Sequence, residues 1–290
     1  MESAALIVEG GGMRGVYAAG VMDFFLDKKL CFAAAYGVSA GAGHLCSFLS
    51  GQRGRAVAIN LDYLGDKRYC SLDSLLKTGD LFGSDMLYDI IPNQLNLYDY
   101  AAFAASPTRF FAAVTNCQTG QAEYLPILDM KRDIIKVRAS SSLPMLARMV
   151  EIDGQKYLDG GMADSIPLQK SIADGNRKNV LILTQHDGYT KGPNRAMGLI
   201  RMKYRKYPGL VEAARTRHIR YNQALELARQ ERERGNAFLI QPRKPVKIGR
   251  VEKNRQKLWA LYEEGYADAQ RCWPELQAFL QKAKEQAKGI

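Results

Sequence analysis

Short runs of apolar residues that end in glycine or polar residues recur along the first two thirds of the chain. Runs of about four to eight such residues are typical of buried β-strands. The two runs on either side of Asp153-Gly154 indicate a hairpin, because Asp-Gly favours the tight turn between antiparallel strands. We expect strands at residues 4–8, 32–38, 109–115, 121–125, 149–152, 156–158 and 179–184.

Stretches with helical spacing of apolar residues alternate with these strands. One begins after Gly15, and another, rich in small residues, covers residues 40–50. Strands that alternate with helices predict an α/β fold with a mainly parallel central sheet flanked by helices. The apolar stripe within residues 79–100 fits either a lid helix over a cleft or an ordinary core helix.

The pattern beyond Gly188 is mostly helical, over about residues 194–206, 208–234 and 253–286. One apolar run at 237–241 interrupts it and could return to the sheet as an added strand. We therefore expect a first domain over residues 1–186 and a mostly helical extension over residues 187–290.

Composition narrows the class of protein. The 290 residues are 47% apolar and 24% charged, as in an ordinary globular protein, and no run is apolar for long enough to span a membrane. The first residues lack the basic and apolar regions of a secretory signal, so we expect a cytoplasmic protein. The five cysteines are scattered without a CxxC pair, which predicts reduced thiols and no metal site.

Charge divides the chain unevenly. Residues 1–186 carry 18 basic and 19 acidic side chains, whereas residues 187–290 carry 23 and 11, so the extension has a net charge of +12. Such a surplus favours contact with an anionic membrane surface or with nucleic acid. Well-solvated helices on the protein surface would explain the same charges equally well.

Three glycine-rich motifs carry the candidate chemistry. They are Gly10-Gly11-Gly12-Met13-Arg14-Gly15, Gly37-Val38-Ser39-Ala40-Gly41 and Asp159-Gly160-Gly161. The first offers unhindered backbone N–H groups at a helix start, where an oxyanion could be held. It also fits a dinucleotide-binding fingerprint, but the second strand then ends in a serine motif where that fold needs an acidic residue.

The second motif matches a nucleophile elbow, a strained strand-to-helix turn that exposes a serine hydroxyl. A tight turn without chemistry remains the alternative for Ser39. An activated serine needs a base, and Asp159 lies on a turn that permits close approach. Among the three histidines, His44 points away from Ser39 on the expected helix and His218 sits in a basic surface run. His186, which follows a strand, is the remaining histidine candidate.

In this order and spacing, the three motifs resemble those of the patatin-like phospholipase family. Its members combine a Gly-rich oxyanion loop, a GxSxG serine and an Asp-Gly-Gly or Asp-Gly-Ala aspartate. The resemblance covers about residues 4–186 and includes the Ala-Ser-rich segment 138–144, which leads to a proline. Glu9 departs from the family, in which many members have aspartate before the glycines. The basic tail is similar to the extension of a bacterial subgroup.

The resemblance implies a hydrolase of lipid acyl esters, such as phospholipids or lysophospholipids, that needs no metal or cofactor. Ser39 would be the nucleophile and Asp159 the base of a dyad. The oxyanion hole would comprise Gly10, Gly11, Gly12, Met13 and Arg14, supported by Gly15, Gly37, Gly41, Gly160 and Gly161. For Arg14 we favour a role in anchoring the loop over one in holding the oxyanion.

Two other functions remain open from the sequence. A patatin-like scaffold could bind a lipid or a partner without turnover. The other is a protein that binds nucleic acid through its basic tail. The tail, however, lacks interleaved aromatic residues and any nucleic-acid motif, so we expect no nucleic-acid partner.

Overall fold

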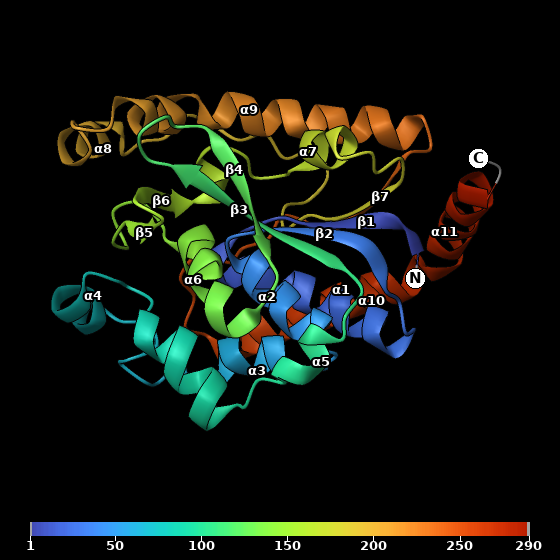
Figure 1. Ribbon diagram of the computed structural model, residues 1–290, viewed down its shortest axis with the longest axis horizontal. Helices are drawn as coiled ribbons and strands as arrows, with labels where there is room; N and C mark the ends of the chain where they lie inside the picture. Colours follow the sequence, from blue (N-terminus) through green and yellow to red (C-terminus); the bar gives the residue numbers. More distant parts are fainter. Residues whose placement is uncertain (1, 289–290) are drawn as a thin grey trace.

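One sheet runs through the whole molecule, as the computed structural model, which describes residues 2–288, shows (Figure 1). Its strand order is β5-β6-β3-β2-β1-β7-β8, with β4 paired to β3. The strands are β1 (Glu2–Val8), β2 (Phe32–Val38), β3 (Arg109–Asn116), β4 (Ala122–Ile127), β5 (Val150–Ile152), β6 (Gln155–Asp159), β7 (Asn179–Ile182) and β8 (Ala237–Ile240). The run from β3 to β8 is parallel, and β4, β5 and β6 pair antiparallel. The expected α/β class is confirmed.

Helices cover both faces of this sheet. The α-helices are α1 (Val16–Asp27), α2 (Ala40–Leu49), α3 (Arg55–Leu61), α4 (Leu72–Thr78), α5 (Tyr100–Ala104), α6 (Met130–Ser141), α7 (Leu168–Ala173), α8 (Met197–Lys203), α9 (Pro208–Glu233), α10 (Arg255–Arg271) and α11 (Trp273–Lys288). Two short 3-10 turns, η1 (Gly12–Gly15) and η3 (Gly160–Met162), and one π-helix, η2 (Met86–Leu95), complete the set. None of the helices within residues 2–288 is long and apolar enough to cross a membrane.

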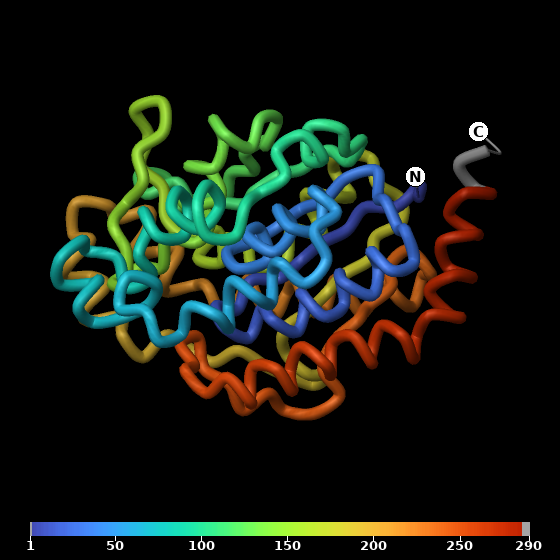
Figure 2. The backbone as a smooth tube through the Cα atoms, turned by 90° about the horizontal axis from the view of Figure 1, so that it is seen from below, coloured from blue at the N-terminus to red at the C-terminus, as the bar shows by residue number. Residues whose placement is uncertain are grey.

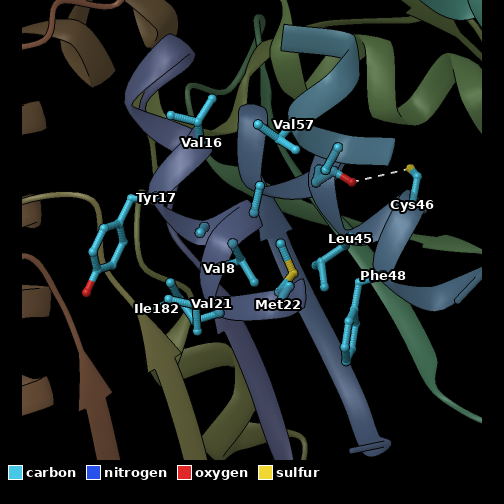
Figure 3. Packing of buried hydrophobic residues seen from close by; sticks show 14 of the residues in the cluster. Val8, Val16, Tyr17, Val21, Met22, Leu45, Cys46, Phe48, Val57 and Ile182 are labelled. Carbon is cyan, nitrogen blue, oxygen red and sulfur yellow. Dashed lines mark hydrogen bonds between the residues drawn. The ribbon is translucent and has the colours of Figure 1, made fainter. Parts of the chain in front are cut away.

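Strand alternation divides the core into two layers. Leu6 and Val8 of β1 pack with α1 and α2, whereas Ala5 and Ile7 pack with residues of α7 and α9 on the other face. Figure 3 shows part of the first layer, where residues of α1 and α2 gather over β1 and Ile182 of β7. Both faces of the parallel strands are therefore covered, which is why their sequences are continuously apolar.

The C-terminal part of the chain belongs to the same body. Strand β8 pairs with β7 in parallel, and α10 packs along α1, as the red and blue helices of Figure 2 show. Three tyrosine hydroxyls donate hydrogen bonds across this helix pair: Tyr17 to Asp268, Tyr262 to Asp23 and Tyr266 to Asp27. Residues beyond 187 thus extend the core of the first domain.

One expectation about the helices needs correction, and another gains detail. The stretch 253–286 forms two helices, α10 and α11, and not one, because Pro274 lacks an N–H and fits only in the first turn of a new helix. The segment 79–100 contains η2, whose wider π-helical turns surround Pro92.

Candidate active site

The elbow serine forms a buried hydrogen bond with the aspartate of the third motif. Ser39 links β2 to α2 with φ 55° and ψ −127°, a strained conformation for a residue with a side chain. This turn directs its Oγ to Asp159 Oδ2, at 2.6 Å. Ser39 is 6% exposed and Asp159 is 3% exposed, so little water competes for the bond.

Asp159 is held in one orientation at the end of β6. Its Oδ1 accepts a hydrogen bond of 2.8 Å from the N–H of Gly161, which leaves Oδ2 for the serine. Burial raises the pKa of Asp159 above the usual aspartate range, and the bond from Ser39 and the charge of Arg217 partly offset that rise. A carboxylate with a raised pKa is a stronger base than an exposed one.

A second serine, which the sequence analysis did not single out as a site residue, stabilises the elbow. The N–H of Ser39 donates to Ser140 Oγ at 2.9 Å, and the Ser140 hydroxyl donates to the Ala113 carbonyl at 2.6 Å. Ser140 belongs to the Ala-Ser-rich segment and lies near the end of α6. Its two bonds tie the elbow to β3.

The first glycine motif runs directly beside Ser39. A methyl group at Gly10 would lie only 2.8 Å from Ser39 Cβ, so only glycine allows this approach. Among the residues that the structure describes, no protein acceptor takes the N–H groups of Gly11 and Gly12. The N–H of Met13 is already occupied, because it donates to the Arg250 carbonyl at 3.0 Å.

The loop is fixed at both ends. The Glu9 carboxylate accepts bonds from the Thr184 N–H at 2.7 Å and the Tyr221 hydroxyl at 2.8 Å, and burial raises its pKa. Arg14 Nη1 donates to the Ile248 carbonyl at 3.4 Å. The bond from Arg14 fits the expected anchoring role. Gly12, at φ +58°, turns the chain between these anchors.

Each of the supporting glycines lies within a secondary-structure element. Gly15 ends η1, Gly37 lies in β2, Gly41 lies in the first turn of α2, and Gly160 and Gly161 form η3.

The hydrogen bond between Ser39 and Asp159 involves none of the three histidines. The buried His44 ring contacts the Asn60 amide at 3.1 Å, and burial lowers its pKa to about 4. The His186 ring lies edge-on to Tyr189. Within residues 2–288, neither His186 nor His218 forms a hydrogen bond with Ser39 or Asp159. The same residues contain no group of three or more histidine, cysteine or acidic side chains that could hold a metal ion.

Two cavities of different character meet at Ser39. The larger, of about 150 Å³, is mainly apolar and extends from Ser39 between α2, α6 and η2. Its apolar and aromatic lining includes Ile59, Tyr69, Phe82, Leu87, Tyr88, Pro92, Tyr98, Tyr100, Met130, Ile134, Val137 and Leu143. Phe82 and Leu87 of the stripe within residues 79–100 thus line this cleft, whereas Leu81, Met86 and Ile91 are buried in the core.

The smaller cavity, of about 30 Å³, lies beside the glycine loop and also contains Ser39 and Asp159. We call it the basic cavity, because its lining includes Arg14, Lys191, Arg217 and Arg250. Three of them lie beyond residue 187, in the part of the chain where we expected surface charge. Their only sequence signal was the excess of positive charge, which says nothing about which residues face inward.

Comparison with known proteins agrees with the motifs. A family model for patatin-like phospholipases matches residues 6–171, and one for a domain of unknown function (DUF6363) matches residues 207–281. The uncharacterized protein YjjU of Escherichia coli is 33% identical over 62% of this chain and 51% of its own length. The protein named "Probable lipid hydrolase 463L" of Invertebrate iridescent virus 6 is 24% identical over 60% of this chain and 65% of its own length.

The chain thus matches about half of the first relative's length and less than two thirds of the second's. Among solved structures, VipD of Legionella pneumophila aligns with 98% of this chain and 67% of its own, at a TM-score of 0.48 and 12% identity. The resemblance inferred from the three motifs is confirmed by the family model, which covers more than half of the residues. The chain belongs to the patatin-like phospholipase family.

Proposed function

We propose that the protein is a serine acyl hydrolase that cleaves lipid esters with a Ser39–Asp159 dyad. The observation that carries this proposal is the 2.6 Å bond from Ser39 Oγ to Asp159 Oδ2 at the end of an apolar cleft. Family membership and the name of the viral relative support a lipid substrate.

In the proposed reaction, Ser39 Oγ attacks the ester carbonyl carbon while Asp159 accepts the hydroxyl proton. The free N–H groups of Gly11 and Gly12 stabilise the oxyanion of the tetrahedral intermediate. The intermediate then expels the alcohol, which takes the proton from Asp159 and leaves an acyl-serine. Water then attacks the acyl-serine while Asp159 accepts one of its protons. The bond between the acyl carbon and Ser39 Oγ breaks, Asp159 returns the proton to Oγ, and the fatty acid departs.

The apolar cleft is the proposed site for the acyl chain. It begins at Ser39, and most of its lining is apolar or aromatic, which suits a hydrocarbon chain. Each methylene group that is buried there contributes about 0.8 kcal/mol to binding.

We further propose that the enzyme acts in the cytoplasm at an anionic membrane surface. The five cysteines are free thiols, which fits a reducing compartment. On α8, the apolar Leu199 and Met202 are 55% and 69% exposed beside several exposed basic residues. Exposed apolar side chains among basic ones are typical of a helix that lies in a membrane interface.

The test is Ser39→Ala together with a fluorophosphonate probe, which labels only an activated serine. We expect the wild-type protein to hydrolyse medium-chain esters and to be labelled, and Ser39→Ala to do neither. Ser106→Ala, in the loop after α5, is the matched control for loss of a serine hydroxyl. An unlabelled wild-type protein would instead support a scaffold without turnover.

A further inference from the structure

One charged side chain lies in the wall of the apolar cleft. Arg55 is the first residue of α3, and among the described residues that line the cleft it is the only one with a charged side chain. His44 also lines the cleft, but burial lowers its pKa to about 4, which leaves it neutral near neutral pH. The charge of Arg55 adds nothing to the binding of a plain hydrocarbon chain, so its place in this wall points to another kind of ligand.

The guanidinium group of Arg55 is buried without a carboxylate partner. The residue is 8% exposed, and within residues 2–288 no acidic side chain forms an ion pair with it. Arginine keeps its charge in proteins and is rarely buried unless an acidic group pairs with it. Burial lowers the pKa of Arg55, as expected for a cation held away from water. In the part of the chain that the structure describes, this cation thus has no counterion.

Part of the hydrogen-bonding capacity of Arg55 is also unused. A guanidinium group has five N–H donors. Nη1 donates to Ser47 Oγ at 3.3 Å and Nη2 to the Asn96 carbonyl at 3.0 Å, whereas Nε is buried with no hydrogen-bond partner among the described residues. The centre of the Tyr98 ring lies 5.0 Å from Arg55 Cζ, and the Tyr98 hydroxyl is fixed by a bond to the Cys46 carbonyl. These contacts hold the guanidinium group in position and leave donors for a ligand.

The charge of Arg55 lies well away from the reacting serine. Ser39 directly precedes α2, and Ser47, which contacts Arg55, follows further along the same helix. With a rise of about 1.5 Å per residue, the two serines are separated by about 12 Å along the helix axis. Three bonds of an extended chain span about 3.3–3.6 Å, so about ten bonds connect a carbonyl carbon at Ser39 with a group at Arg55.

We propose that Arg55 binds a carboxylate at the distal end of the acyl chain, so that the substrate is a monoester of a medium-chain dicarboxylic acid. The inference rests on the proposed function and adds the class of acyl group. The methylene groups between the two ends contact the apolar lining of the cleft. The distal carboxylate takes no part in the reaction: only the ester bond breaks, and the free dicarboxylic acid is the product.

A carboxylate suits this site better than a neutral group does. It accepts two parallel hydrogen bonds from a guanidinium group and supplies the missing negative charge. Folding has already removed Arg55 from water, so the hydration lost on binding is mainly that of the ligand.

The experiment compares two nitrophenyl esters that differ only at the distal end of the acyl chain. The monoester of decanedioate has a carboxylate there, and the decanoate ester has a methyl group. We expect kcat/KM to be larger for the decanedioate ester. The ratio of the two values should fall by at least about tenfold in Arg55→Met, which keeps a long side chain but removes the charged contact. An unchanged ratio in this variant, folded by its thermal melt, would overturn the proposal.

Further variants separate ligand binding from a structural role of Arg55, whose bond to Asn96 also ties the end of η2 to α3. A structural role alone would lower kcat/KM for both esters and leave their ratio unchanged. Arg55→Lys keeps the charge without the planar fork and should retain part of the ratio. Arg53→Met removes a charge that is 52% exposed and pairs with Asp27, and it should leave the ratio unchanged. If Arg55→Met does not fold, Arg55→Gln, which keeps a hydrogen-bond donor, takes its place.

The length of the dicarboxylate tests the position of the charge. The preference over the matching fatty ester should be largest at about ten carbons, because shorter chains do not reach Arg55 and longer ones must bend. A preference that is largest for the monoester of butanedioate would assign recognition to the basic cavity beside Ser39 and would overturn the role of Arg55.

A binding measurement separates this proposal from the proposed function. Calorimetry with monomethyl decanedioate on Ser39→Ala should show binding that is lost when Arg55→Met is added, even if the wild-type protein hydrolyses no ester. If the wild-type protein hydrolyses both esters but neither binding nor the ratio depends on Arg55, the proposed function stands and this inference is wrong. If decanoate binds as tightly as monomethyl decanedioate and the ratio is unchanged in Arg55→Met, Arg55 holds the carboxylate of a free fatty acid, and the substrate assignment is wrong.

Discussion

The two cavities that meet at Ser39 differ in where their walls come from. The apolar cleft is lined by residues between Gly12 and Leu143, within the segment that the patatin-like family model matches. The basic cavity takes Arg217 and Arg250 from the C-terminal region. The cleft proposed for the acyl chain is therefore built from the first part of the chain alone, whereas the wall beside Asp159 includes residues from both parts.

The largest effect should come from Asp159, the proposed base, which is hydrogen-bonded to the serine that both cavities share. Asp159→Asn keeps the shape of the side chain but removes its capacity to accept the serine proton, so kcat should fall by at least about 10²–10⁴-fold. Steady-state hydrolysis of a neutral nitrophenyl ester measures this loss. His44→Ala, His186→Ala and His218→Ala are the comparison set and should retain most of their rate. A folded histidine variant with a comparable loss would replace the dyad with a triad.

The glycine loop lies where the two parts of the chain meet, and Gly12→Val tests that contact. The new side chain would place Cβ 2.5 Å from the Arg250 carbonyl, at a φ of +58° that a β-branched residue avoids. We expect loss of at least about 10²-fold in kcat, as for removal of an oxyanion donor. A thermal melt must accompany the kinetics, and near-normal hydrolysis by the folded variant would contradict an oxyanion role for the loop.

The sequence pointed to Ser39, Asp159 and the strands but not to the basic side chains beside them, for physical reasons. Ser39 and Asp159 could be found because a strained elbow and a close approach require glycines at fixed spacing, and those glycines are visible in the sequence. The strands could be predicted equally well, since buried parallel strands are continuously apolar. By contrast, α9 is polar along much of its length, so nothing local shows that Arg217 faces the site while Arg215 pairs with Glu212 in solvent.

The pH dependence of hydrolysis tests whether the charge of Arg217 lowers the pKa of Asp159. The ionised Asp159 accepts the serine proton, so activity on a neutral ester is lost as the pH falls through the raised pKa of Asp159, tenfold per pH unit below it. Arg217 lowers that pKa through its charge. Arg217→Met should therefore move the acid limb of the kcat profile to higher pH. A limb that stays in place would show that the charge of Arg217 does not reach the base.

The apolar cleft can be shortened without a change in the basic cavity. Ile134 lines the cleft, whereas its neighbour Ile135 is 38% exposed on the same helix, α6. Ile134→Trp should reduce kcat/KM for a long-chain ester relative to a short-chain one by about tenfold, equivalent to about two methylene groups. Ile135→Trp adds the same volume outside the cleft and should leave the chain-length profile unchanged. Equal profiles for both variants would place the acyl chain elsewhere.

The smallest expected effect is on membrane binding, and it comes from basic side chains that face solvent and not Ser39. If α8 and the turn after it contact membranes, sedimentation with anionic liposomes should be strong at low salt and weak at high salt, by up to about 1 kcal/mol per basic residue. Glutamine at four positions should weaken it: Arg201, Lys203, Arg205 and Lys206. The matched control removes as much charge from the segment before α10: Arg243, Lys244, Lys247 and Lys253. Equal losses of liposome binding in the two quadruple variants would mean that binding depends on net charge alone. No particular surface of the protein would then be responsible for it.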